Sequence, residues 1–349
     1  MSYICDNIIK WAQYLGQTFD QKARSLSNEQ LNIFAICFFF IFCLMCTIMC
    51  TIMCTILRGS MIKKIFIRIC DSFIFKPIKA NDNLHKKWTQ HPHVIHNKIE
   101  SSDGETIEGI FYNKHRIPSY QNDLICLYSH GNSGWIGSVL EADVGAITDR
   151  MSIFVYDYRG YGNSTGQPSD RGCMKNILEV YDYLLGKGVD PKKIILFGHS
   201  LGGCVSSYLL NYLIERSDRT GETYPKHIIL QNPFQNIQRI CGEVVPILGY
   251  YVVSDLQTDR FISNMDRLIG LTTEGSTEGL TKDKTLIKVL IIYCIGDELI
   301  NRQHSIDLLD SIQHMDKQLI SVPGTHDEPV YTKEVDDYLD ALCNLNKYA

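Results

Sequence analysis

The sequence predicts one transmembrane helix followed by an α/β domain. The sheet of this domain is mostly parallel, begins with an antiparallel hairpin and has helices on both faces. From residue 93 onward, short apolar runs alternate with helical patterns, which is typical of a parallel sheet covered by helices. Before them, the 27 residues from Leu31 to Leu57 carry no charge, which is long enough to span a bilayer. The chain that remains, about 260 residues, has the size of one α/β domain.

Composition and charge argue against several other classes of protein. Of 349 residues, 45% are hydrophobic and 21% are charged, which excludes a disordered or collagen-like chain. Residues 58–88 carry eight Lys and Arg against two Asp and Glu, whereas residues 89–349 carry 23 against 34. The acidic body argues against nucleic-acid binding, because phosphate recognition depends on clustered positive charge. The basic stretch suits anionic lipid heads, so we expect membrane lipids as partners.

These patterns divide the chain into four parts. We expect an N-terminal segment at 1–30 that can form a short amphipathic helix, a transmembrane helix at 31–57, a basic juxtamembrane linker at 58–88 and the α/β domain at 89–349. The Lys and Arg that follow the apolar segment predict a single-pass membrane protein with its α/β domain in the cytosol. Thirteen cysteines without disulfide-type spacing fit that reducing compartment.

The transmembrane segment contains the tetrad Met-Cys-Thr-Ile three times between Met45 and Ile56. Four residues are close to one helical turn, so the repeat forms stripes along the helix. A homo-oligomer that packs through this helix is one interpretation, and drift of the coding sequence is the other.

The body begins with a predicted hairpin, His93 to Ile99 and Glu105 to Tyr112, around the turn at 102–104. Six apolar runs follow and predict strands that are buried on both faces: 124–128, 152–156, 193–197, 227–230, 288–295 and 319–322. Helical patterns separate most of them: 136–148, 171–185, 200–214, 303–313 and 327–342. The alternation stops between strands at about 232–285, where we expect a partly helical cap followed by a mobile loop.

The sequence Gly198-His199-Ser200-Leu201-Gly202 lies between a predicted strand and a predicted helix. A tight turn of this kind leaves no room for side chains at its flanks, so Gly198 and Gly202 allow it to close and to present Ser200. This context makes a nucleophilic serine the better interpretation than an ordinary glycine-rich turn.

A serine nucleophile needs a histidine base and a carboxylate that orients it. His326 is the histidine that follows the last predicted strand. Asp297 follows the strand before that one, with Glu298 as the fallback acid. The sequence therefore predicts Ser200, Asp297 and His326 as a catalytic triad.

Acyl transfer also needs backbone N–H donors for the developing oxyanion. The segment His130-Gly131-Asn132-Ser133-Gly134 follows the first predicted parallel strand. We expect the N–H groups of Asn132 and Leu201 to form the oxyanion hole, with Ser133 as the alternative donor. We interpret Asp157 and Arg159, which follow the next strand, as structural residues that hold loops beneath the site.

The sequence offers little sign of a metal or a cofactor. His91, His93 and His96 form the pattern H-x-H-x-x-H, but no cysteine or acidic partner lies near them in the sequence, so we expect no metal site. Neither a P-loop nor a G-x-G-x-x-G motif occurs, so we expect no nucleotide cofactor.

The combination of His130-Gly131-Asn132, the segment DYRGYGNS, GHSLGG, Asp297 and His326 resembles the α/β-hydrolase superfamily over roughly residues 90 to 345. It is most similar to the membrane-anchored branch with monoacylglycerol-lipase-like and protein-depalmitoylase-like serine hydrolases. The resemblance implies a serine hydrolase that cleaves acyl esters or thioesters through an acyl-enzyme. An aminopeptidase-like amide hydrolase and a catalytically silent membrane scaffold on the same fold are the alternatives.

Overall fold

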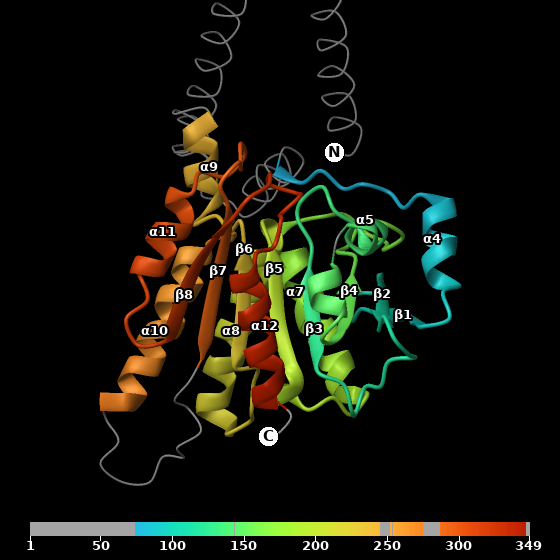
Figure 1. Cartoon of the computed structure of the whole chain (residues 1–349), viewed down its shortest axis with the longest axis horizontal. Coiled ribbons are helices and arrows are strands. Elements are labelled where there is room, and N and C mark those ends of the chain that lie inside the picture. The colour runs from blue at the N-terminus through green and yellow to red at the C-terminus, as the bar shows by residue number, and fades with distance from the viewer. Residues whose placement is uncertain (1–73, 143, 245–251, 253, 275–286, 347–349) are drawn as a thin grey trace, which may run out of the picture. The chain divides into compact units, whose positions relative to one another are not determined.

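The computed structural model describes residues 74–142, 144–244, 252, 254–274 and 287–346. This part of the chain forms an eight-stranded sheet with the strand order β1-β2-β4-β3-β5-β6-β7-β8 (Figure 1). The strands are β1 (Val94–Glu100), β2 (Thr106–Tyr112), β3 (Ile125–Ser129), β4 (Ser152–Tyr156), β5 (Ile194–His199), β6 (His227–Gln231), β7 (Lys288–Cys294) and β8 (Asp316–Val322). β1 and β2 form an antiparallel hairpin, β2 pairs antiparallel with β4, and the remaining pairs are parallel. The predicted hairpin and mostly parallel sheet are confirmed.

Helices cover both faces of the sheet, and each face has its own apolar core. One layer contains α7 (Asp170–Gly186), α8 (Leu201–Thr220), α10 (Thr258–Glu274) and α11 (Gln303–Asp310). The other layer contains α4 (Asp82–Thr89), α5 (Ile136–Glu141), α6 (Gly145–Thr148) and α12 (Lys333–Asn346), the last of which lies in front of the sheet in Figure 1. Strands β3, β4 and β5 are buried along their whole length, because both of their faces contact helices.

Several predicted helices differ from the observed ones at their ends: the helix predicted over 200–214 continues to Thr220, and the one predicted over 303–313 ends at Asp310. The single helix predicted over 136–148 is two helices, because Ala142 is extended (ψ 160°) and ends α5. The helix predicted from Asp327 begins at Lys333, because residues before it form a turn in which Gly324 bridges Pro329. The helices were predicted from the periodic spacing of apolar residues, and short polar turns of this kind do not interrupt that spacing.

The insertion at 232–285 contains helices, as expected for its first part: α9 (Ile237–Val244) and α10. α10 packs against α8 and buries Ile262, Met265 and Ile269. Its buried carboxylate, Asp266, accepts hydrogen bonds from the backbone N–H groups of Gln313, His314 and Met315 at 2.7–3.1 Å. The insertion is thereby joined to the turn that precedes β8. The predicted mobile loop falls largely on residues 275–286, outside the described residues.

The predicted amphipathic segment at 1–30 and transmembrane helix at 31–57 also lie outside the described residues. Among the helices that the structure does describe, none has the length and apolarity needed to cross a bilayer.

Replacing Asp266 with Ala should lower the free energy of unfolding by about 3 kcal/mol, because three buried N–H donors lose their charged acceptor. Urea unfolding of the full-length chain in mild detergent, followed by tryptophan fluorescence, measures this change. The exposed Asp310 provides the control, and Asp310→Ala should change stability by less than about 0.5 kcal/mol. Equal losses in the two variants would contradict the anchoring role of Asp266.

Candidate active site

A sharp turn between β5 and α8 carries Ser200, which is buried and directly precedes the helix. Its backbone has φ 52° and ψ −113°, in a region that residues with a side chain rarely adopt. The Ser200 N–H donates to the carbonyl of Gln231 at the end of β6 (2.9 Å), which fixes the turn to the neighbouring strand. Strained residues of this kind persist where the surrounding structure holds them, and they cluster at active sites.

The glycines on either side of Ser200 have no space for a side chain. A Cβ atom at Gly198 would overlap the backbone of Gly202, and one at Gly202 would overlap the carbonyl of Ser129 at the end of β3. Strand, turn and helix therefore approach each other at backbone distance. This close approach is the physical reason for the glycines that the sequence motif contains.

Asp297 and His326 lie after β7 and β8 and are joined by a hydrogen bond of 2.7 Å between Oδ2 and Nδ1. The other carboxylate oxygen accepts the backbone N–H groups of Leu299 and Ile300 at 2.8 Å each. Burial alone raises the pKa of Asp297, but these three hydrogen bonds outweigh it and hold the pKa below its usual value. The carboxylate therefore stays ionised, and its bond to Nδ1 leaves Nε2 of His326 as the ring nitrogen for other partners.

Two further residues hold the His326 carbonyl, and sequence-based prediction missed both. Asn232 donates to it through Nδ2 (2.8 Å), and His199 lies 2.8 Å from it through Nε2. Asn232 has φ 46°, and its Oδ1 accepts the N–H of Cys294 (2.8 Å), so one side chain ties the end of β7 to the loop after β8. Burial, followed by the neighbouring His326, lowers the pKa of His199, which keeps its ring neutral at pH 7.

The same contacts bring Ser200 and His326 to one edge of the sheet. His199, which contacts the His326 carbonyl, directly precedes Ser200 in the sequence. Gln231, which directly precedes Asn232, accepts the N–H of Ser200. Among the described residues, no hydrogen bond joins the Ser200 hydroxyl to the His326 ring. Of the predicted triad, the structure contains the hydrogen bond between Asp297 and His326, and it places Ser200 at the same edge of the sheet.

The loop after β3 lies against the turn of Ser200. A Cβ atom on Gly131 would come 3.0 Å from His199 Nδ1 and 3.6 Å from Ser200 Cβ, so this backbone packs directly on the serine. Asn132, one predicted oxyanion donor, is the next residue. The other, Leu201, is the first residue of α8, where backbone N–H groups have no partner within the helix. The alternative donor, Ser133, is exposed.

The side chain of Asn132 has a separate part in this loop that the sequence did not indicate. Its Oδ1 accepts from the Tyr161 hydroxyl (2.6 Å) and the Lys76 N–H (3.1 Å), and its Nδ2 donates to the Ile74 carbonyl (2.6 Å). The amide therefore fixes the loop that carries the predicted oxyanion donor to the first described residues of the chain.

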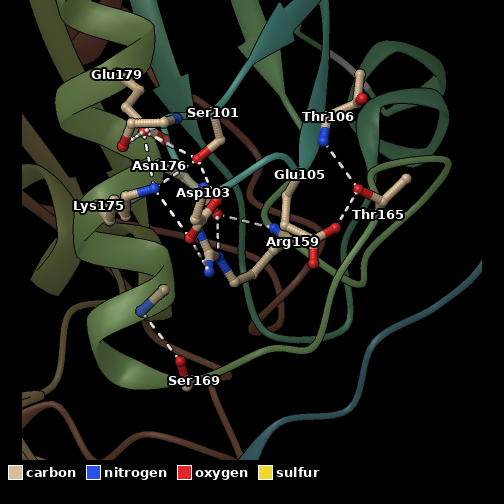
Figure 2. Close-up of polar contacts among 12 residues, drawn as sticks. Ser101, Asp103, Glu105, Thr106, Arg159, Thr165, Ser169, Lys175, Asn176 and Glu179 are labelled. Carbon is tan, nitrogen blue, oxygen red and sulfur yellow. Dashed lines mark hydrogen bonds and ion pairs between the residues drawn. The ribbon is translucent and has the colours of Figure 1, made fainter.

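Asp157 and Arg159 hold loops and helices together, in agreement with their predicted structural role. Asp157 is fully buried and accepts the N–H of Ile136, the first residue of α5 (2.7 Å). Figure 2 shows Arg159 between the hairpin turn and α7, where its guanidinium donates to the Asp103 carboxylate (3.1 Å) and its backbone N–H donates to Asn176 Oδ1 (2.9 Å). The network continues through these contacts: Lys175 to Asp103 at 2.9 Å, Lys175 to Glu179 at 3.0 Å and Ser101 to Asp103 at 2.6 Å.

Comparison with known proteins agrees with this geometry. The family model described as steryl acetyl hydrolase matches residues 39–246. The lysophosphatidylserine lipase ABHD12 of Mus musculus is 37% identical over 119 residues, which are 34% of this chain and 28% of the mouse protein. The uncharacterized protein YfhR of Escherichia coli K12 is 25% identical over 250 residues, 71% of this chain and 78% of that protein.

Among solved structures, an alpha-beta hydrolase from Vibrio vulnificus matches with a TM-score of 0.58 at 14% identity, over 82% of this chain and 95% of that one. This likeness establishes the α/β-hydrolase fold. The curated mouse relative is much longer than the region it shares with this chain, since the alignment spans less than a third of its length.

Gly202→Ala should reduce ester hydrolysis by at least about 100-fold, because the new methyl group must push Ser129 away from the turn and displace Ser200. Gly203→Ala is the matched control, since a Cβ there meets no atom nearer than 3.5 Å. Initial rates on p-nitrophenyl acetate, per folded protein, measure the difference. Equal activity of the two variants would show that the close approach does not position Ser200.

Asn232 should act as a positioning residue for His326. Asn232→Gly permits the same left-handed backbone without the amide, and Asn232→Asp retains an acceptor for Cys294 but has no donor for the His326 carbonyl. Both should lower kcat by about 100-fold with KM nearly unchanged, because the imidazole loses its alignment. A normal kcat in Asn232→Asp would contradict the role of that donor.

Proposed function

The chain belongs to the family described as steryl acetyl hydrolase, and from this premise we propose that it is a membrane-anchored serine hydrolase that uses Ser200, His326 and Asp297. The chain is an ester-hydrolysing enzyme of the α/β-hydrolase fold. The observation that carries the proposed triad is the 2.7 Å hydrogen bond from His326 to the ionised Asp297, on the sheet edge where the strained Ser200 turn also lies.

In the proposed mechanism, Ser200 Oγ attacks the acyl carbon and its proton passes to His326 Nε2. The hydrogen bond from His326 Nδ1 to Asp297 keeps the other ring proton on Nδ1, and the carboxylate stabilises the imidazolium that forms. The N–H groups of Asn132 and Leu201 stabilise the oxyanion of the tetrahedral intermediate. When this intermediate collapses, His326 returns the proton to the departing alcohol or thiol. Water then attacks the acyl-enzyme with the same base and releases the acid and Ser200.

The substrate that we propose is an acyl ester or thioester at a membrane surface. An anchor at Leu31–Leu57, crossing once, with the basic stretch and the hydrolase domain on the cytosolic side, would hold the enzyme beside acylated lipids or lipidated proteins. The names of its relatives, a lysophosphatidylserine lipase and a steryl acetyl hydrolase family, favour a lipid ester.

A fluorophosphonate probe tests the nucleophile. The full-length chain in detergent should be labelled, and Ser200→Ala should abolish labelling and lower ester hydrolysis by at least about 10⁴-fold. Ser263→Ala, an exposed serine on α10, is the control and should behave as the unaltered chain.

The class of bond is tested with matched substrates that share one acyl group. Turnover of the oxygen ester and the thioester, with little turnover of an aminoacyl-anilide, is the expected result. Equal labelling of Ser200→Ala, or preference for the anilide, would contradict the proposal.

A further inference from the structure

Two histidines and one buried carboxylate meet outside the active site. The Nε2 atoms of His85 and His96 lie 2.8 Å and 2.6 Å from the same oxygen of Glu108, Oε1. One ligand atom from each residue lies within 4.8 Å of the other two. We infer that His85, His96 and Glu108 bind a divalent transition-metal ion, of which Zn²⁺ fits the donors best.

The fold brings these three residues together from three elements, so they are in place before any ion binds. His85 lies on α4, His96 on the edge strand β1 and Glu108 on β2. The antiparallel register sets Glu108 opposite Lys98, two residues from His96 on the same face of β1. α4 is fixed over this hairpin by Trp88, which packs edge-to-face on Tyr112 of β2. These elements appear together at the blue end of the sheet in Figure 1.

The donor set is that of an open zinc site. Two imidazole nitrogens and one carboxylate are a common set of three protein ligands for Zn²⁺, with water in the fourth position. The side chain of Glu108 is 5% exposed, whereas those of His85 and His96 are 25% and 27% exposed. The carboxylate therefore forms the floor, and solvent reaches the ligands from the histidine side.

The second oxygen of Glu108 is the independent observation that points to a ligand. Oε2 is buried, and it has no hydrogen-bond partner in the described part of the chain. A buried carboxylate oxygen without a partner is costly, and a bound dication removes that cost. The two histidines occupy only Oε1, so a carboxylate paired with histidines alone leaves half of Glu108 unsatisfied.

Metal binding requires that Nε2 of each histidine loses its proton. Each Nε2–H···Oε1 hydrogen bond is replaced by an Nε2–metal bond, and the ring proton that remains is carried on Nδ1. A ring that was cationic releases one proton to solvent, and a neutral ring changes tautomer without release. Burial raises the pKa of Glu108, but the hydrogen bonds from His96 and His85 outweigh burial and hold the pKa below its usual value.

The structure also corrects which residues accompany His96. The sequence pattern grouped it with His91 and His93, without an acidic partner. Instead His91 Nδ1 accepts the N–H of His93 (3.1 Å), and His93 Nδ1 contacts the Lys114 carbonyl (2.9 Å). His93 therefore serves as a matched control: a histidine on the same stretch of chain that is outside the inferred site.

The test is a zinc titration of the full-length chain in detergent after removal of metals with a chelator. The unaltered chain and His93→Gln should bind one more equivalent of Zn²⁺ than His85→Gln, His96→Gln or Glu108→Gln. Counting the difference excludes ions held by cysteines or by the active-site histidines, because all variants retain those residues. Zn²⁺ should also raise the melting temperature of the unaltered chain and His93→Gln by more than it raises that of the three ligand variants.

Co²⁺ provides a spectroscopic check. The additional equivalent should give the visible bands of a tetrahedral nitrogen and oxygen site, without the near-ultraviolet charge-transfer band of a thiolate. Equal zinc stoichiometry in all five proteins, or a thiolate band from the additional equivalent, would overturn the inference. If Glu108→Gln fails to fold, the two histidine variants decide the outcome, since their side chains lie partly in solvent.

Discussion

The close packing of one turn against its neighbours is the constraint on which the site depends. Strand β5, the turn at Ser200 and helix α8 meet at a distance that admits no side chain at Gly198 or Gly202. The turn can hold Ser200 in a strained conformation because buried side chains of α8, among them Leu201, Cys204 and Val205, fix the helix to the sheet. The packing energy of the core therefore compensates the local backbone strain at Ser200.

The parallel sheet then determines what else gathers near that turn. Loops that follow β3, β6, β7 and β8 emerge at the same edge, because parallel strands share one direction. Each loop contributes a different kind of group: a glycine backbone at Gly131, an amide at Asn232, a carboxylate at Asp297 and an imidazole at His326. The side chain of Asn232 joins two of these loops, so their relative position does not depend on the backbone alone.

Much of this arrangement was predictable from sequence, and the remainder was not, for a physical reason. A hairpin pattern predicted the first two strands and apolar runs predicted the other six, while strand ends indicated Ser200, Asp297 and His326, because such patterns and strand-end positions are local properties. Asn232, His199 and the side chain of Asn132 act through hydrogen bonds to backbone atoms that are 62 to 94, 127 and 56 to 58 residues away. Such bonds leave no repeating pattern. The same holds for Glu108, whose histidine partners only the folded hairpin and α4 reveal.

The bonds of Asn132 extend the site to the beginning of the described chain. Ile74 and Lys76 bond its amide, Phe75 between them is buried in the core, and the Gly162 N–H donates to the Ile78 carbonyl. These first described residues therefore lie against the loop that contains Asn132 and against the turn at Gly162. The Asn132 amide has three hydrogen-bond partners, so it cannot shift relative to these first residues without losing at least one of those bonds. The first described residues and the loop after β3 are therefore joined through the side chain of Asn132.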